Sequence, residues 1–203
     1  MQAFTTLTGR AAPLPLANID TDVIIRIERL TGGDPATLGR FAFEALRYGP
    51  EGAENPDFVL NRPLYRGAPI LVAGANFGCG SSREGAVTAL MGLGVRCVIA
   101  DSFGDIFYSN CCQNGLLPVR LPAAEVAALV RLASAGEVTV DLAARTVTAP
   151  DGSAFAFEID PLRREALMEG LDDLGVTLKQ MDQVRAWQAD DRHARPWAWP
   201  ALA

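Results

Sequence analysis

The chain has 203 residues, of which 49% are hydrophobic, and a formal net charge of −6. This apolar content is enough for a sizeable core in one domain, or in one domain with a modest appendage. The excess of 24 Asp and Glu over 18 Lys and Arg argues against a broad electrostatic surface for nucleic acid. We recognise neither a leader segment nor an apolar run that would span a bilayer. The sequence therefore predicts a cytoplasmic protein that binds neither nucleic acid nor membrane.

The first third of the chain predicts short, irregular elements. Residues 4–11 alternate weakly and predict one short strand, followed by a proline-bearing loop. Residues 23–25 predict a brief buried strand or turn. Gly39 to Tyr48 favour a short amphipathic helix among turn residues. We expect residues 26–57 to form a mobile or substrate-facing loop.

From residue 68 onwards the pattern becomes regular and predicts alternating strands and helices. Two apolar strands at 68–74 and 95–100 enclose a helix at 84–94. The further elements expected are a helix at 105–115, a strand at 116–121, a helix at 123–135, strands at 137–142, 145–150 and 153–159, and a helical stretch at about 161–189. The sequence predicts a single α/β domain over residues 1–203, with a mixed sheet and a C-terminal helical tail at about 161–203.

The cysteine usage argues against both a disulfide framework and a metal site. The four cysteines are Cys79, Cys97, Cys111 and Cys112. Disulfide frameworks belong to shorter, loop-rich secreted chains, so reduced thiols are the simpler expectation. Adjacent side chains on a helix diverge by about 100°, so Cys111 and Cys112 do not predict a metal site built by this chain alone. Cys79 stands between two glycines, where it is either a reactive thiol or simply a small residue in a tight loop.

The stretch NFGCGSSRE, residues 76–84, is the strongest candidate for a functional loop. It joins a predicted strand to a predicted helix, and open α/β folds commonly bind ligands at this carboxyl edge of the sheet. Its two inner glycines permit close approach of a ligand. Ser81 with Glu84 fits an S-x-x-E capping box, and a helix N-terminus stabilises an anion. Arg83 adds a planar guanidinium suited to a carboxylate.

Two phosphate-binding interpretations of this loop fail. A P-loop needs lysine after its final glycine, where this chain has Ser81. A dinucleotide fingerprint needs a third glycine where this chain has Arg83. A capped helix without any chemistry remains an open alternative.

Several separate motifs agree in order with one family. Besides NFGCGSSRE, these are NIDTDVII (18–25), NPDFVLNRPLYRGAPILVAG (55–74), DSFGDIFYSNCCQNGLLPV (101–119) and, more loosely, FEIDPLRREALMEGLDDLGVTL (157–178). Together they resemble the small subunit of 3-isopropylmalate dehydratase, a family similar to the swivelling C-terminal domain of aconitases. The resemblance implies a swivelling-type β/α domain.

The resemblance also implies a function in leucine biosynthesis. It implies a hydro-lyase that isomerises 2-isopropylmalate and 3-isopropylmalate by dehydration and rehydration through a cis-alkene. The implied partner is a large subunit that carries a [4Fe-4S] cluster as Lewis acid, so this chain alone would be half of an active site and would bind no cofactor itself.

The resemblance assigns roles to individual residues. It implies that Ser81 exchanges a proton with the substrate carbon, while Asp20 and Thr21 support the N-terminal loop. Its implied substrate-binding residues are Asp22, Ser82 and Arg83. For the DTD sequence, an Asx-type turn without a functional role is the alternative.

Two departures from the family pattern concern specificity. Relatives usually follow DTD-x-I-I with proline and a small or basic residue, whereas this chain has Arg26 and Ile27. The possible specificity loop comprises Arg26, Ile27, Arg29, Leu30 and Thr31, in which Arg26 or Arg29 would meet an extra substrate charge. Gly85 stands where the family usually has histidine.

These departures leave other functions open. One is a paralogous small subunit for another substituted malate, for example a methyl-substituted one. Another is a noncatalytic carboxylate-binding or regulatory module, and a third is a nucleotide-binding domain, which the failed fingerprints disfavour. The tail with Trp197 and Trp199 is expected either to cover an apolar patch or to contact another chain.

Overall fold

The computed structural model describes residues 1–31 and 35–199. Within these residues the strands form two four-stranded sheets, a parallel one of order β2-β3-β4-β5 and an antiparallel one of order β1-β6-β7-β8. The strands are β1 (Thr6–Gly9), β2 (Ala11–Leu14), β3 (Ile70–Ala73), β4 (Cys97–Ala100), β5 (Leu117–Arg120), β6 (Val138–Asp141), β7 (Thr146–Thr148) and β8 (Ala154–Ala156). The predicted α/β class is confirmed, with its parallel and antiparallel pairings in separate sheets.

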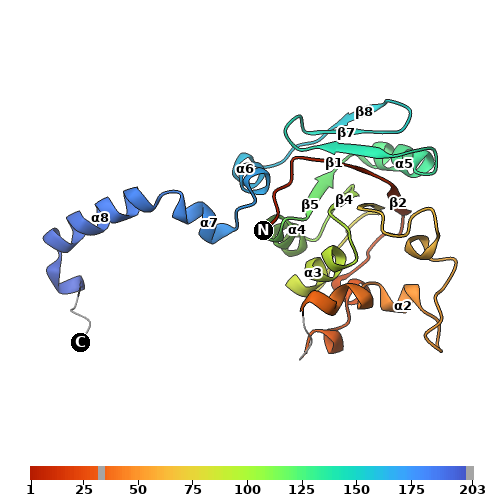
Figure 1. Cartoon of the computed structure of the whole chain (residues 1–203), viewed down its shortest axis with the longest axis horizontal. Coiled ribbons are helices and arrows are strands. Elements are labelled where there is room, and N and C mark those ends of the chain that lie inside the picture. Colours follow the sequence, from red (N-terminus) through yellow and green to blue (C-terminus); the bar gives the residue numbers. More distant parts are fainter. Residues whose placement is uncertain (32–34, 200–203) are drawn as a thin grey trace.

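The parallel sheet forms the centre of the fold. Every residue of β3 and β4 is buried, as is typical of parallel strands covered on both faces. The helix α5 (Ala123–Leu132) packs against β3 and β4, whereas α3 (Glu84–Gly92) and α4 (Asp105–Asn114) pack against each other. Figure 1 shows α5 above the parallel strands and α3 and α4 below them. The predicted strand, helix, strand unit is confirmed as β3-α3-β4.

The single strand predicted over residues 4–11 is wrong, because the chain changes sheets there. Leu7 pairs with Val140 in the antiparallel sheet, and Ala12 pairs with Leu71 in the parallel sheet. Arg10 lies between the two strands, and its guanidinium donates to the carbonyls of residues 134 and 136. Gly9, immediately before Arg10, is the local sequence signal at this change of partner.

The segment before the parallel strands contains short helical turns. Residues 23 and 24 belong to α1 (Thr21–Ile24) rather than to a strand. The carboxylate of Asp20 accepts a hydrogen bond from the Val23 amide at 2.7 Å and so caps this helical turn. The single helix predicted for 39–48 is also wrong. The left-handed conformation of Phe43 (φ 55°) ends one helical segment and starts another. The elements are η1 (Ile27–Arg29), η2 (Pro35–Phe41), α2 (Glu44–Arg47) and η3 (Val59–Asn61).

A buried arginine holds this segment together. Nη1 of Arg47 lies 3.3 to 3.4 Å from the carbonyl oxygens of Gly39, Arg40 and Ala42. The amide of Asn61 donates to the Arg47 carbonyl at 2.7 Å. Residues 32–34 lie outside the described residues, and the predicted mobility of 26–57 stays a prediction.

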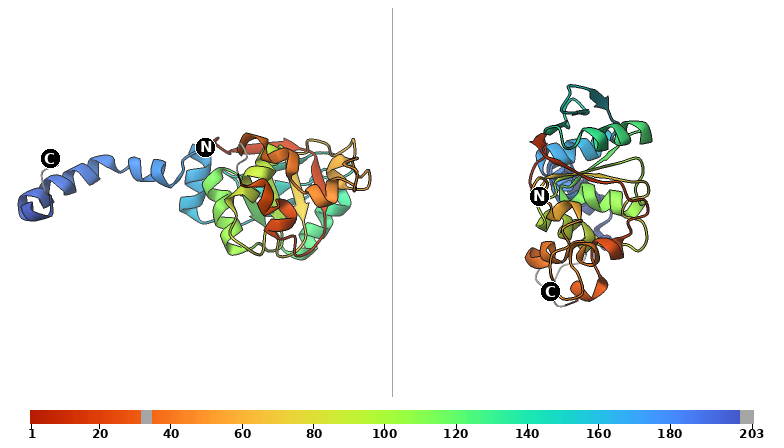
Figure 2. Two further views of the ribbon diagram at one scale, coloured as in Figure 1. Left: turned by 90° about the horizontal axis from the view of Figure 1, so that it is seen from below. Right: turned by 90° about the vertical axis from the view of Figure 1, so that its right-hand side faces the viewer.

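The described C-terminal helical tail contains three α-helices and the short 3-10 helix η4 (Pro196–Ala198). Asp160 caps α6 (Pro161–Glu169), which packs against α4. Gly170, with a left-handed φ of 71°, ends α6. The helices α7 (Asp173–Leu178) and α8 (Met181–Ala194) then project away from the sheets (Figures 1 and 2).

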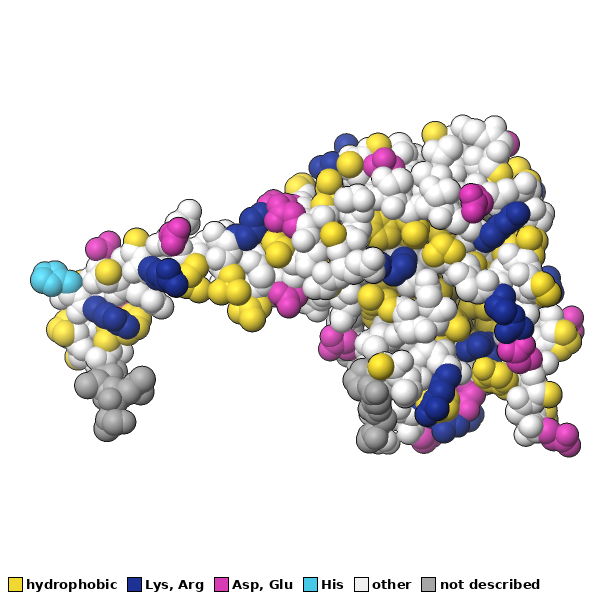
Figure 3. Space-filling model, viewed as in Figure 1, with side chains coloured by type: hydrophobic (Ala, Val, Ile, Leu, Met, Phe, Trp, Pro, Cys, Tyr) yellow, Lys and Arg dark blue, Asp and Glu magenta, His cyan; other side chains and the backbone are white. Residues whose placement is uncertain are grey.

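The two tail tryptophans have different surroundings. The indole of Trp199 donates to the Asp191 carboxylate at 2.8 Å, whereas Trp197 is 77% exposed. Hydrophobic side chains lie along this tail on the surface shown in Figure 3. The described part of the segment around Trp197 and Trp199 projects away from the sheets and does not cover an apolar patch of the body, while contact with another chain stays a prediction. Among the described residues, no helix combines the length and hydrophobicity needed to cross a bilayer.

We expect Gly39→Ala to lower the free energy of unfolding by about 1–3 kcal/mol, the usual cost of overpacking. A Cβ at Gly39 would come within 2.1 Å of the Gly92 backbone at the end of α3, so η2 would be pushed from α3. Gly49→Ala is the control, because its Cβ would meet nothing closer than 3.8 Å. Urea denaturation measures both, and equal stability of the two variants would contradict the close packing.

Candidate active site

The loop 76–83 lies at the carboxyl edge of the parallel sheet, as predicted. It connects the end of β3 to the start of α3. The amide of Phe77 donates to the Ser102 carbonyl, and the amide of Gly104 donates to the Phe77 carbonyl, both at 3.0 Å. These bonds join the loop to the one that follows β4.

A second set of hydrogen bonds joins this loop to the N-terminal loop that contains DTD. The Gly78 amide donates to the Ile19 carbonyl at 2.7 Å, and the Thr21 amide donates to the Cys79 carbonyl at 3.0 Å. The buried hydroxyl of Thr21 donates to the Ser81 carbonyl at 2.9 Å. Asp20 caps α1, and Thr21 joins the N-terminal loop to the serine loop.

Gly78 allows the loop to approach α4. Its φ is 71°, in the left-handed region, and a Cβ there would come within 2.2 Å of the Phe107 ring. Phe107 also packs edge-on against Phe77, with ring centroids 5.5 Å apart. An aromatic cluster thus supports the loop from beneath.

The predicted capping box is wrong. The N-cap of α3 is Arg83, in an extended conformation, and its side chain makes no cap hydrogen bond. The carbonyl of Ser81 is held by Thr21 instead, and Glu84 accepts a hydrogen bond from Asn114 at 3.1 Å. The side chains of Ser81 and Ser82 are exposed and are not used to cap the helix.

The structure brings Asp22 and Arg83 together. Nη1 of Arg83 forms an ion pair with Oδ1 of Asp22. The arginine side chain is only 13% exposed, whereas the aspartate side chain is 56% exposed. Among the contacts of the described residues, this buried Nη1 makes no well-aligned hydrogen bond, so the contact that the structure gives it is the ion pair with Asp22. Four predicted residues, Asp22, Ser81, Ser82 and Arg83, thus lie on two adjoining loops.

The possible specificity loop is attached to the segment that follows it. Nε and Nη2 of Arg29 donate to the Glu44 carboxylate at 2.9 and 2.6 Å. These hydrogen bonds lower the pKa of Glu44 and raise the pKa of Arg29 from their ordinary values. The Arg29 guanidinium also lies 4.4 Å from the centroid of the Phe41 ring. Arg29 is therefore already paired, whereas Ile27 and Thr31 are exposed.

A cavity of about 720 Å³ lies beside this loop. Arg26 lines it together with Arg40, Glu44 and Tyr48, among others. Sequence analysis missed Arg40, Glu44 and Tyr48 because no local pattern connects them with residue 26. Glu44 lies 15 residues from Arg29, a spacing without meaning inside a single helix or strand.

The comparisons with known proteins identify the family. Residues 1–124 match the model of the aconitase C-terminal domain, and residues 127–161 match a model described as LeuD_N. The 3-isopropylmalate dehydratase small subunit of Paramagnetospirillum magneticum is 52% identical over 97% of this chain and 100% of its own. The chain belongs to the 3-isopropylmalate dehydratase small subunit family. The small subunit of Paracoccus denitrificans is 51% identical with the same coverage.

A solved structure also resembles the chain. The 3-isopropylmalate dehydratase (leuD) of Methanocaldococcus jannaschii has a TM-score of 0.67 and 29% identity, over 89% of this chain and 99% of its own. The aconitase C-terminal-like fold implied by the sequence is thereby confirmed.

The cysteines of this small-subunit family member do not converge on a metal. Within residues 1–31 and 35–199, no group of three His, Cys, Asp or Glu side chains is arranged to hold one. Cys97, Cys111 and Cys112 are buried, and burial raises the pKa of each thiol, that of Cys112 to about 11.

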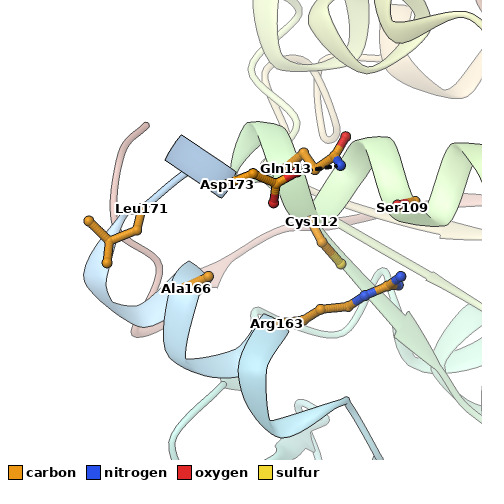
Figure 4. A pocket seen from close by; sticks show the side chains of 7 residues that line it. All are labelled: Ser109, Cys112, Gln113, Arg163, Ala166, Leu171 and Asp173. Atoms are coloured by element: carbon orange, nitrogen blue, oxygen red, sulfur yellow. Dashed lines mark hydrogen bonds between the residues drawn. The ribbon is translucent and has the colours of Figure 1, made fainter. Parts of the chain in front are cut away.

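A small cavity of about 140 Å³ lies between α4 and α6 (Figure 4). Its lining includes Cys112, Arg163 and Leu171. Beside it, Gln113 donates to the Asp173 carboxylate at 2.9 Å and so joins α4 to the start of α7. None of the predicted site residues lines it, so we assign it to the attachment of the tail.

We expect one thiol per folded chain to react rapidly with a thiol reagent such as DTNB at pH 8. Cys79 is partly exposed, whereas the other three thiols are buried and have raised pKa values, so they react only when the protein unfolds. A spectrophotometric time course measures this. Cys79→Ser removes the fast phase, and a fast phase of two or more thiols would contradict the packing.

Proposed function

We propose that this chain is the small subunit of a heteromeric hydro-lyase that interconverts 2-isopropylmalate and 3-isopropylmalate in leucine biosynthesis. The observation that carries the proposal is the meeting of Asp22, Arg83 and the two serines on hydrogen-bonded loops at the sheet edge. The relatives named for this activity match nearly the whole chain. The paralogue and the noncatalytic module are less favoured, because the similar curated relatives carry the same enzyme name.

Ser81 is proposed as the group that exchanges a proton with the substrate. Dehydration takes a proton from one carbon and a hydroxyl from the neighbouring carbon; rehydration returns both with their positions exchanged. Thr21 fixes the Ser81 carbonyl while the Ser81 side chain stays exposed. The positive charge of Arg83, two residues away, stabilises the alkoxide that takes the proton.

Arg83, Ser82 and Asp22 are proposed to bind the substrate. A planar guanidinium donates two parallel hydrogen bonds to a carboxylate. Asp22 keeps Arg83 in place through the ion pair, so the guanidinium does not need to be ordered when the diacid arrives. Ser82 is exposed beside it and supplies a further hydroxyl donor.

The specificity loop is proposed to shape the pocket around the substrate's variable group. Ile27 is 48% exposed and offers an apolar side chain, while Leu30 packs against the core and Thr31 is exposed. Arg29 is engaged by Glu44, so Arg26 is the better candidate for a further substrate charge.

The partner is proposed to be a cytoplasmic large subunit of the dehydratase. By family resemblance that subunit holds a [4Fe-4S] cluster, which supplies Lewis-acid chemistry when bound. This chain contributes the proton-exchanging serine and the carboxylate-binding groups. Activity therefore requires both chains.

We expect Ser81→Ala to lower kcat of the reconstituted enzyme by about 10²–10⁴-fold with little change in KM, because the proton-transfer group is lost. The measurement is turnover of 3-isopropylmalate after co-purification with the large subunit. Ser134→Ala, which alters an exposed serine beyond α5, is the control and should be fully active. Full activity of Ser81→Ala would refute the catalytic role, and an inactive wild-type pair would refute the proposed function.

We expect Arg83→Lys to raise KM by roughly 10- to 100-fold, because a hydrogen bond to a charged group contributes about 1.5–3 kcal/mol. Lysine keeps the charge but cannot donate two parallel bonds. Steady-state kinetics of the same complex measure the change. Arg185→Lys, on the projecting helix α8, is the matched control, and an unchanged KM in Arg83→Lys would contradict carboxylate binding.

A further inference from the structure

Leu30 of the specificity loop lies directly over Gly85 at the start of α3. A Cβ built on Gly85 would come within 2.4 Å of Leu30 Cδ2 and 3.2 Å of Leu30 Cδ1. Leu30 is partly buried and packs against the core. Leu30 therefore occupies the space that a side chain at residue 85 would fill.

The backbone at Gly85 gives no other reason for glycine. Its φ lies outside the left-handed region, and it is the second residue of a regular helix. Glycine in a helix is less favourable than alanine by up to about 1 kcal/mol. The contact with Leu30 is the feature of the described structure that opposes a side chain there.

This contact links the two functional parts of the candidate site. Gly85 follows Arg83 by two residues and Ser81 by four, whereas Leu30 follows Arg29, which Glu44 holds by two hydrogen bonds. The specificity loop is thus attached on one side by an ion pair and on the other by an apolar contact. Since Arg29 and Leu30 are neighbours, a shift at one strains the other.

We propose that Gly85 and Leu30 are positioning residues that set the distance between the specificity loop and the serine loop. They thereby determine how closely the pocket fits the alkyl group on the malate. This inference rests on the proposed function. A side chain at residue 85 moves the loop away from Ser81, so the large isopropyl group loses more contacts than a methyl group does.

The test compares kcat/KM for 3-isopropylmalate with kcat/KM for 3-methylmalate in the full complex. One or two carbons in an apolar pocket change such a ratio by about 10-fold or more, so Gly85→Ala should lower the preference for the isopropyl substrate at least about fivefold. The change should appear as a raised KM for 3-isopropylmalate, with kcat kept within about threefold. A general loss of stability would lower both activities together and leave the ratio unchanged.

The reciprocal variant identifies the contact. Leu30→Ala removes the atoms that a side chain at residue 85 would meet, so adding Gly85→Ala to it should not change the ratio further. Equal effects of Gly85→Ala with and without Leu30→Ala would overturn the proposal, as would an unchanged ratio in the single variant. If Gly85→Ala does not assemble, Leu30→Val tests the contact without added atoms, and an unchanged ratio there overturns it. An inactive wild-type complex refutes the proposed function and this inference together. If the wild-type complex is active but Gly85→Ala leaves the substrate ratio unchanged, the inference alone is refuted.

Discussion

The candidate site depends on backbone hydrogen bonds between two loops that are far apart in the sequence. The amides of Gly78 and Thr21 donate to carbonyls of the opposite loop, and the Thr21 hydroxyl donates to the Ser81 carbonyl. Buried backbone donors and acceptors must be paired to avoid a free-energy cost, so the two loops stabilise each other. Their pairing fixes where Ser81 and Asp22 stand before any substrate arrives.

The charges of the site follow from this pairing. Because α1 lies beside the serine loop, Asp22 is next to Arg83. Its negative charge balances the positive charge of a guanidinium that is mostly buried. An unpaired buried charge would be costly. The ion pair also keeps the arginine at the edge of the sheet. Asp20 caps the first turn of α1, and Asp22 forms the ion pair with Arg83.

The sequence predicted the place of the serine loop because the elements on both sides have strong patterns. β3 is a continuous apolar strand, and α3 follows it after glycines and serines. The capping box failed because Thr21, 60 residues away, holds the Ser81 carbonyl and the helix starts later, at Glu84. The sequence pattern also did not predict the change of sheet at Arg10 or the attachment of Arg29 to Glu44. Both depend on tertiary contacts, which leave no helical or strand periodicity in the sequence. The roles of the site residues came from the family resemblance, since spacing alone left a capped helix equally open.

The two parts of the site are held by different kinds of contact. The serine loop and the DTD loop are joined mainly through backbone groups, together with the Thr21 hydroxyl. The specificity loop is held by side chains, namely the carboxylate of Glu44 and the apolar end of Leu30 over Gly85. Among the described residues, these side chains take no part in the hydrogen bonds that position Ser81. The fold therefore separates the contacts that hold residues 26–31 from those that hold the loop of Ser81 and Arg83.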